Sequence, residues 1–176
     1  MADIIEGRNP VIEALKSGRP INRILLARGT ERNAAIVEIF QLARSRGIPV
    51  EHVPRETLGR SGATSAHQGV IAYAAVKEYL ALEDLLAVSK RKNEPPLYCI
   101  LDGIEDPQNL GAILRTADAS GFHGVIIRSR RAAGLTAAVA KASAGAVEYV
   151  PVARVPNIAQ TIEIMKKNNI WVVGID

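Results

Sequence analysis

The chain has 176 residues, of which 48% are hydrophobic and 23% are charged, with 14 glycines and 9 prolines. This composition is typical of a globular protein and excludes the collagen-like, disordered and disulfide-scaffold classes. The apolar runs span a few residues, far below the roughly 20 that a membrane helix needs. Its start lacks a signal peptide pattern, and Cys99 is the one cysteine. We expect a soluble, cytoplasmic protein without a metal site.

The charge of the chain favours a polyanionic partner without requiring one. The formal net charge is +4, and residues 1–76 carry ten Lys and Arg against seven Asp and Glu. Nearly all of these basic residues are arginines, whose planar guanidinium can bind two phosphate oxygens. The alternative is an ordinary mixed surface that is solvated on all sides.

The first half of the chain alternates predicted helices and strands. Asn9 is expected to cap a helix with Pro10 as its first residue, and Gly18 to end it. The further elements predicted here are a strand at 21–27, a helix from its cap Thr30 to Gly47, and strands at 48–53 and 69–76. This alternation indicates a layered α/β unit with crossover connections.

A polar joint separates the two halves. A short helix is predicted at 80–89, and the following segment 90–96, with two consecutive prolines, is expected to break regular structure. We therefore divide the chain into a first domain (1–76), a linker (77–94) and a second domain (95–176). An internal loop of one domain is the alternative.

The second half is typical of a parallel sheet that is buried on both faces. Its predicted elements are strands at 97–101, 124–127, 149–152 and 170–173, helices at 106–121 and 136–144, and a helix capped by Asn157. Trp171 and the methionines are expected in the core. In such sheets ligands bind in the loops at the carboxyl ends of the strands.

The chemistry concentrates in the segment that follows strand 97–101. Asp106 and Pro107 open a helix, and Asn109 and Arg115 lie close to that opening. Six residues correspond to about 120° around a helix, so either Asn109 precedes the regular helix or the Arg115 side chain reaches around it. We expect a partly buried Arg115 that needs an anionic partner. Both side chains also have structural alternatives. Arg115 could form an ion pair with Asp102 or Asp118, and Asn109 could have a turn or cap role.

Several motifs together resemble one family. Segments 106–117, 119–121 and 124–125 resemble the first signature of the SpoU (TrmH-like) RNA 2′-O-ribose methyltransferases, and segments 141–146 and 150–152 resemble the part that follows it. Segments 6–11 and 67–70 resemble the small ribosomal-protein-like RNA-binding domain that precedes many of these enzymes. The likeness covers nearly the whole chain, in order, and is most specific for the bacterial large-subunit rRNA guanosine methylases.

This resemblance implies a fold and an activity. The fold would be a small α/β RNA-binding domain followed by a parallel-sheet SPOUT (α/β knot) domain in a homodimer. The activity would be methyl transfer from S-adenosylmethionine to a ribose 2′-hydroxyl of rRNA, with Asn109 and Arg115 in the active site. Because a guanidinium stays protonated and is a poor base, we expect Arg115 to act as an electrostatic clamp and Asn109 to orient the ribose.

The chain also departs from the family pattern. The family's two further motifs, a Gly-x-Glu-x-x-Gly loop and a proline-bearing stretch leading to Ser-Leu-Asn, do not occur in this sequence. The resemblance implies that these segments form the knot and supply most cofactor contacts, so the cofactor-binding residues are expected beyond Asp176. We therefore expect a C-terminally truncated enzyme, inactive alone and with a compromised dimer interface. A catalytically silent RNA-binding module is the alternative function.

Further residues are candidates for RNA contact. Arg128, Arg130 and Arg131 follow a predicted strand and suit phosphate, although a solvated loop explains them equally well. Contacts to RNA loops are expected from three residues of the first half: Arg8, Asn9 and Gln68. Arg8 has the alternative of pairing with an acidic neighbour, and the nearby His67 that of a structural role.

Overall fold

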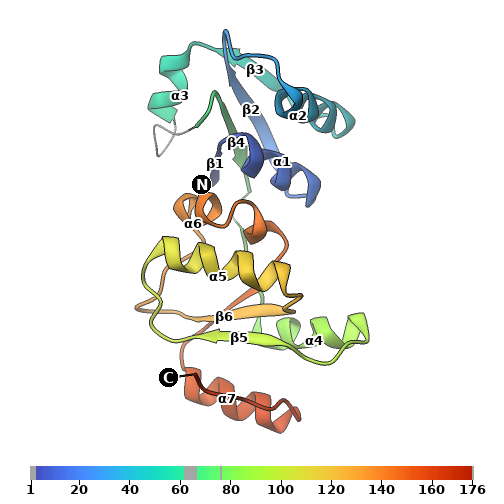
Figure 1. The fold of residues 1–176 in the computed structure, drawn as a ribbon, viewed down its shortest axis with the longest axis vertical. Coiled ribbons are helices and arrows are strands. Elements are labelled where there is room, and N and C mark those ends of the chain that lie inside the picture. Colours follow the sequence, from blue (N-terminus) through green and yellow to red (C-terminus); the bar gives the residue numbers. More distant parts are fainter. Residues whose placement is uncertain (1–2, 62–66, 76, 176) are drawn as a thin grey trace.

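The computed structural model describes residues 3–61, 67–75 and 77–175, which form two α/β units stacked along the long axis of the molecule (Figure 1). The N-terminal unit (residues 3–61 and 67–75) is built on a four-stranded sheet, sheet A, of order β1-β4-β2-β3. The C-terminal unit (residues 77–175) is built on a three-stranded sheet, sheet B, of order β5-β6-β7. The α/β class expected from the sequence is confirmed, and the placement of the domain boundaries stays a prediction.

The N-terminal unit packs helices on both faces of a mixed sheet. Strand β2 is parallel to β3, and β4 is antiparallel to both β1 and β2. Apolar residues of α1 and α2 form the larger core on one face, while Leu58 of α3 covers the other. Its elements are β1 (Asp3–Glu6), α1 (Arg8–Lys16), β2 (Ile21–Ala27), α2 (Ala34–Ser45), β3 (Val50–Val53), α3 (Arg55–Ser61) and β4 (Val70–Ala74).

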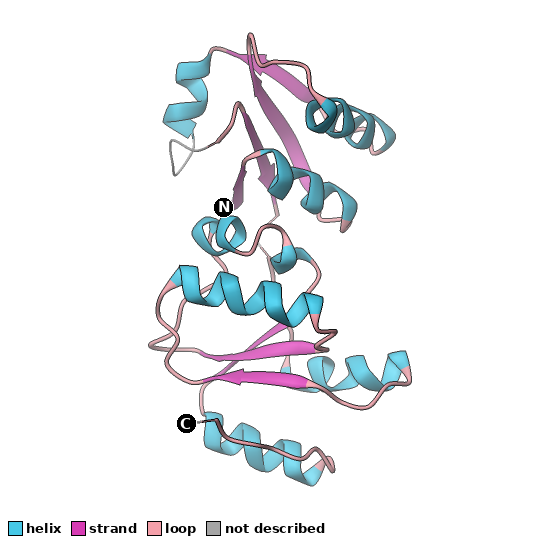
Figure 2. Ribbon diagram, viewed as in Figure 1, coloured by secondary structure: helices cyan, strands magenta, loops and turns pink. Residues whose placement is uncertain are grey.

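The C-terminal unit has three layers around a parallel sheet, as its continuous apolar strands predicted (Figure 2). Val125 and Ile127 of β6 face the core under α5 and α6, whereas Ile126 faces the core under α4 and α7. Its elements are α4 (Leu82–Lys92), β5 (Tyr98–Leu101), α5 (Pro107–Ala119), β6 (Gly124–Arg128), α6 (Ala137–Ala142), the 3-10 helix η1 (Ala146–Glu148), β7 (Val152–Val155) and α7 (Ile158–Lys167).

Of the three predicted helix caps, two are wrong and one is right. Helix α1 is capped by Gly7 at φ 96°, so Asn9 lies inside the first turn. Thr30 donates to the backbone of Ala27 instead, and the α2 cap is Asn33, whose side chain accepts from Ile36 N. The side chain of Asn157 accepts from Gln160 N as predicted, and Asp106 and Thr136 cap α5 and α6 in the same way. Asn9 and Thr30 thus indicated correctly that a helix begins nearby, but they did not identify the residue that caps it.

The prediction from the sequence did not include β1 or α3, and it was wrong about three features of the C-terminal unit. Helix α4 continues through the basic run to Lys92 and ends at Asn93 in the left-handed conformation, so the irregular segment is residues 93–97. Strand β7 begins three residues later than predicted, because a turn after η1 takes up residues 149–151. Residues 170–173 do not form a strand, and Trp171 is 95% exposed instead of buried. Met165, in contrast, is buried as expected.

A close approach of α5 to α6 makes one glycine sterically necessary. A Cβ added at Gly111 would lie 2.4 Å from Ala142 Cβ and 2.8 Å from the backbone nitrogen of Ser143. Because the backbone cannot yield as the end of a long side chain does, we expect Gly111→Ala to lower the free energy of unfolding by about 1–3 kcal/mol.

Gly59→Ala is the matched control for this substitution. Gly59 is also helical, in α3, and nothing lies within 4 Å of an added Cβ there. We expect the control to raise stability by about 0.5–1 kcal/mol through the higher helix propensity of alanine. Urea unfolding of both variants checks the pair, and equal stabilities would contradict the steric argument.

Candidate functional site

Helix α5 presents both candidate catalytic side chains on its exposed surface. The carboxylate of Asp106 accepts from Gln108 N at 2.8 Å, and Pro107 fits the first position because its missing N–H needs no partner. Asn109 therefore lies within the first turn and not on a preceding loop. The buried positions of α5 lie between these: Leu110, Leu114 and Ala117 belong to the core over sheet B, and Gly111 faces α6.

Arg115 differs from the expectation of a partly buried side chain. It is exposed, and it forms no ion pair or hydrogen bond with another residue in the described ranges. Its expected partner Asp102 pairs with Arg128 instead, at 3.0 Å. The guanidinium of Arg115 is thus available to a ligand, and the reading of Arg115 as a structural ion pair is wrong.

Two loops meet at the carboxyl edge of sheet B, beside the start of α5. The loop after β5 and the loop after β6 are joined by the Asp102–Arg128 pair and by the backbone bond from Ala133 N to Ile104 O, at 2.8 Å. Arg130 and Arg131 lie exposed on the second loop. Of the three clustered arginines, Arg128 is therefore neutralised by a carboxylate, and the other two are free of ion pairs with described residues.

Arg8 and Gln68 are brought together at one end of sheet A. The backbone N–H of Arg8 donates to Gln68 Oε1, and Arg8 Nε donates to the backbone oxygen of Gln68, both at 3.3 Å. Asn9 is exposed beside them. His67 is buried, and its Nδ1 accepts from Gly69 N at 3.1 Å, so it holds the turn into β4 and does not face a ligand.

Two further arginines at the same end were not singled out from the sequence. Strands β2 and β3 are parallel, so their carboxyl ends share one edge, and Arg28 N donates there to Val53 O at 2.8 Å. Arg28 follows β2 and Arg55 follows β3, and both are exposed. An arginine directly after a predicted strand was the available signal. We call Arg8, Asn9, Arg28, Arg55 and Gln68 the distal edge of sheet A.

An apolar groove runs along α5 beside β5, the edge strand of sheet B. Its volume is about 240 Å³. Burial raises the pKa of the Cys99 thiol, so this thiol stays protonated and is a weak nucleophile. The hydroxyl of Thr116 donates to the backbone oxygen of Ala112. The lining residues are Cys99, Ala112, Ile113, Thr116, Ala117 and Phe122.

Two other kinds of site find no support in the described part of the chain. Within residues 3–61, 67–75 and 77–175, no three His, Cys, Asp or Glu side chains are grouped so that they could hold a metal ion. None of the helices in these ranges has the length and apolar character needed to cross a membrane.

Comparison with known proteins gives two family matches that follow each other along the chain. A family model for RNA 2′-O ribose methyltransferase substrate binding matches residues 4–80. A model for the SpoU rRNA methylase family matches residues 96–176. The first match covers the N-terminal unit and the second covers the loops and the helix that carry Asn109 and Arg115.

Bacterial relatives match almost the whole chain. A TrmH family tRNA/rRNA methyltransferase of Bacillus subtilis is 50% identical over 174 residues, which is 99% of this chain and 69% of that protein. One from Staphylococcus saprophyticus is 49% identical, over 97% of this chain and 68% of that protein.

Solved structures share the fold. An AdoMet-bound rRNA methyltransferase from Sinorhizobium meliloti superposes with a TM-score of 0.72 at 26% identity, and the SpoU methyltransferase AviRb from Streptomyces viridochromogenes with 0.72 at 23%. Each match covers 94% of this chain but only 58% of the solved chain. On the family models and the relatives, the chain belongs to the SpoU (TrmH-like) RNA methyltransferase family.

Proposed function

We propose that this protein acts in the 2′-O-methylation of a ribose in ribosomal RNA, at a guanosine of the large subunit. The observation that carries the proposal is the exposure of Asn109 and Arg115 on one proline-initiated helix, beside the carboxyl edge of a parallel sheet. Ligands of open parallel sheets bind at this edge. The family models and the tRNA/rRNA methyltransferase relatives support the substrate class.

Asn109 and Arg115 have different roles at the ribose. The 2′-hydroxyl must lose its proton, and negative charge then develops on its oxygen. The guanidinium of Arg115 stays protonated at neutral pH, so it stabilises this charge and holds the neighbouring phosphate, and does not act as the base. The amide of Asn109 both donates and accepts hydrogen bonds, which suits it to orient the sugar hydroxyls.

The arginines on the two edges supply the phosphate contacts. Arg130 and Arg131 lie on a loop beside α5, and Arg28 and Arg55 lie on the distal edge of sheet A. Arginine contacts to phosphate position RNA without reading its sequence. Asn9 and Gln68 add amide groups that can contact base edges and the 2′-hydroxyl of exposed RNA loops.

The methyl donor under this proposal is S-adenosylmethionine, to which two of the structural neighbours are bound. The donor carries an adenine, a ribose diol, an amino acid and a sulfonium, so its site needs polar partners. The groove along α5 offers a neutral thiol and a hydroxyl that already donates to the backbone. The residues that line this groove therefore do not fit the cofactor by themselves.

The proposal includes three further parts. They are the homodimer, the cytoplasmic location, and the division into an RNA-binding domain (1–76), a linker (77–94) and a methyltransferase domain (95–176). A catalytically silent RNA-binding module is the second candidate function. The misfit of the groove favours it for the 176-residue polypeptide, and a methylation assay of that polypeptide on ribosomal RNA separates the two.

The first prediction concerns RNA binding by the distal edge. We expect the double variant Arg28→Ala/Arg55→Ala to bind ribosomal RNA more weakly, with the slope of log K against log salt reduced by about one for each arginine removed. Arg44→Ala is the control, because Arg44 is an equally exposed arginine in the last turn of α2, toward the opposite end of the sheet. Filter binding at several salt concentrations measures both, and a salt slope unchanged from wild type would contradict the assignment.

The second prediction concerns the cofactor. We expect isothermal titration of the 176-residue polypeptide with S-adenosylmethionine to show no micromolar binding, because the groove along α5 lacks polar partners. A one-to-one isotherm in the micromolar range would overturn this expectation and would also remove the support for the silent-module alternative.

The third prediction tests the clamp. Arg115→Lys keeps the charge but replaces the planar fork by a point charge, so we expect methyl transfer to fall at least about tenfold. The substitution is made in an intact enzyme that contains this segment, so that turnover is measurable. Arg91→Lys on α4, also an exposed arginine, is expected to have no effect. Near-full methylation by Arg115→Lys would refute the clamp.

A further inference from the structure

The two units have separate hydrophobic cores. Two clusters of buried apolar residues lie wholly within residues 3–61 and 67–75, and two others wholly within residues 77–175. None of these four clusters contains residues of both units. Domains joined without a large apolar interface are expected to move relative to each other. The two units meet where α6 lies beside β1 and where η1 lies beside α1, and polar contacts bridge the units at the second of these places.

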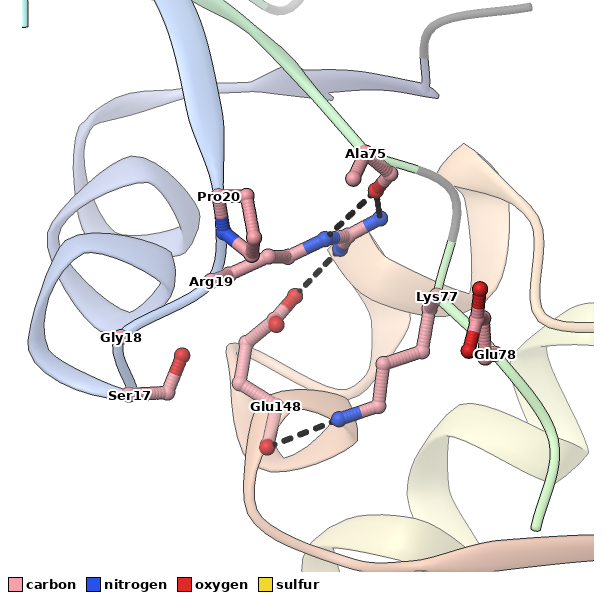
Figure 3. A pocket seen from close by; sticks show the side chains of 8 residues that line it. All are labelled: Ser17, Gly18, Arg19, Pro20, Ala75, Lys77, Glu78 and Glu148. Atoms are coloured by element: carbon pink, nitrogen blue, oxygen red, sulfur yellow. Dashed lines mark hydrogen bonds and ion pairs between the residues drawn. The ribbon is translucent and has the colours of Figure 1, made fainter.

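These polar contacts converge on one short segment, residues 145–149, around η1 (Figure 3). Arg19 Nη1 donates to Glu148 Oε1 at 2.7 Å. Within the C-terminal unit, Lys77 Nζ donates to the backbone oxygen of the same Glu148 at 2.9 Å. The Tyr149 hydroxyl donates to Glu13 Oε2 at 2.8 Å. Burial, with the hydrogen bond to Glu13, raises the pKa of Tyr149 to about 12, so this hydroxyl stays a donor at neutral pH.

The segment also approaches the N-terminal unit closely. A Cβ added at Gly145, which has φ 98°, would lie 2.6 Å from Glu13 Cβ. Beside this contact the packing is incomplete, because a cavity of about 360 Å³ opens between the units, with Ser17 and Pro20 on one side and Glu148 on the other. Such a space forfeits the dispersion contacts of a closed interface.

The Arg19–Glu148 ion pair can open without leaving Arg19 buried and without a partner. The side chains of Arg19 and Glu148 are 5% and 2% exposed. Arg19 is also bonded to Asp3 and, through Nε and Nη2, to the backbone oxygen of Ala75 at 3.0 and 2.8 Å. These partners belong to its own unit, so Arg19 keeps them when the units part.

Glu148 gains solvent on separation. In the docked arrangement its Oε2 has no hydrogen-bond partner among the described residues, although it is buried. Separation would hydrate both carboxylate oxygens. Burial lowers the pKa of Lys77, because removal from water disfavours its charged ammonium form. A buried ion pair recovers little more than its desolvation penalty, so the docked arrangement is only weakly favoured.

The docking end of sheet A lies opposite its distal edge. Asp3 and Ile21 both pair with Ala74 near the junction, whereas Glu6 pairs with Ile71 and Leu26 with Val70 at the other end of the same strands. The seven residues of β2 separate the two ends, a length of roughly 23 Å at 3.3 Å per residue. In the docked arrangement the distal edge therefore points away from the C-terminal unit (Figure 1).

We propose that the Arg19–Glu148 pair is a reversible latch, which holds the N-terminal unit docked on residues 145–149 and releases it as an intact folded unit when it opens. Opening lets the distal edge turn toward Asn109 and Arg115, a consequence that rests on the proposed function. The latch itself depends only on the contacts at the junction.

Amide ¹⁵N relaxation of the labelled 176-residue chain tests the latch. In the wild type we expect both units to share one rotational correlation time. In Glu148→Ala we expect two separate values, each reduced to roughly half, because each released unit has about half of the mass. The control Glu163→Ala removes an acidic residue of an exposed ion pair on α7, and we expect it to retain the single value.

A second variant covers the case in which Glu148→Ala unfolds the C-terminal unit, seen as loss of amide dispersion. Glu13→Ala removes the bond to Tyr149 from a partly exposed side chain outside both cores, and we expect it to lower the correlation time of the N-terminal unit. Two values in the wild type, or one wild-type value in every folded variant, would overturn the latch. No RNA or methyl donor is present, so failure of the proposed function would leave this result unchanged.

Discussion

The close contact between Gly111 of α5 and the backbone of residues 142–143 is the constraint on which the candidate site depends. It fixes the rotation of α5 about its own axis, because Leu110, Leu114 and Ala117 then fill the core over sheet B. With that rotation set, Asn109 and Arg115 are left on the exposed surface beside the carboxyl edge. Apolar packing thus places the polar pair, and neither side chain needs a protein partner to hold its helix.

The sequence predicted those parts of the structure whose signals are local. Strand β2 has its predicted limits, and α5 begins at the expected Asp106 and Pro107, since caps and apolar periodicity act over a few residues. Residues 170–173 have an equally apolar pattern but pair with no strand of the described residues, and Trp171 is exposed. A strand needs a partner that its own residues do not specify, which is why this prediction failed.

The roles of the arginines could not be predicted, because each depends on what the fold brings to it. Arg19 is buried against Asp3 and Glu148, which are 16 and 129 residues away along the chain. Arg23 lies over the ring of Tyr73, with 4.7 Å between its guanidinium carbon and the ring centre. Arg128 forms an ion pair with Asp102, the carboxylate that we had considered as a partner of Arg115. One residue type therefore serves as interface ion, stacking group and free surface charge, and the charge count alone distinguishes none of these.

The placement of the two arginine-bearing edges constrains the RNA under the proposed function. The distal edge and the docking end of sheet A are separated by the length of β2, roughly 23 Å at 3.3 Å per residue. An RNA that touches Arg28 and Arg115 at once in the docked arrangement must extend over at least that length, which a folded RNA segment does and a single nucleotide does not. Recognition of RNA by shape and phosphate contacts operates over such distances. Because the distal edge lies one strand length from the junction, a small rotation of the N-terminal unit at the junction moves the distal edge far more than it moves the contacts around Glu148.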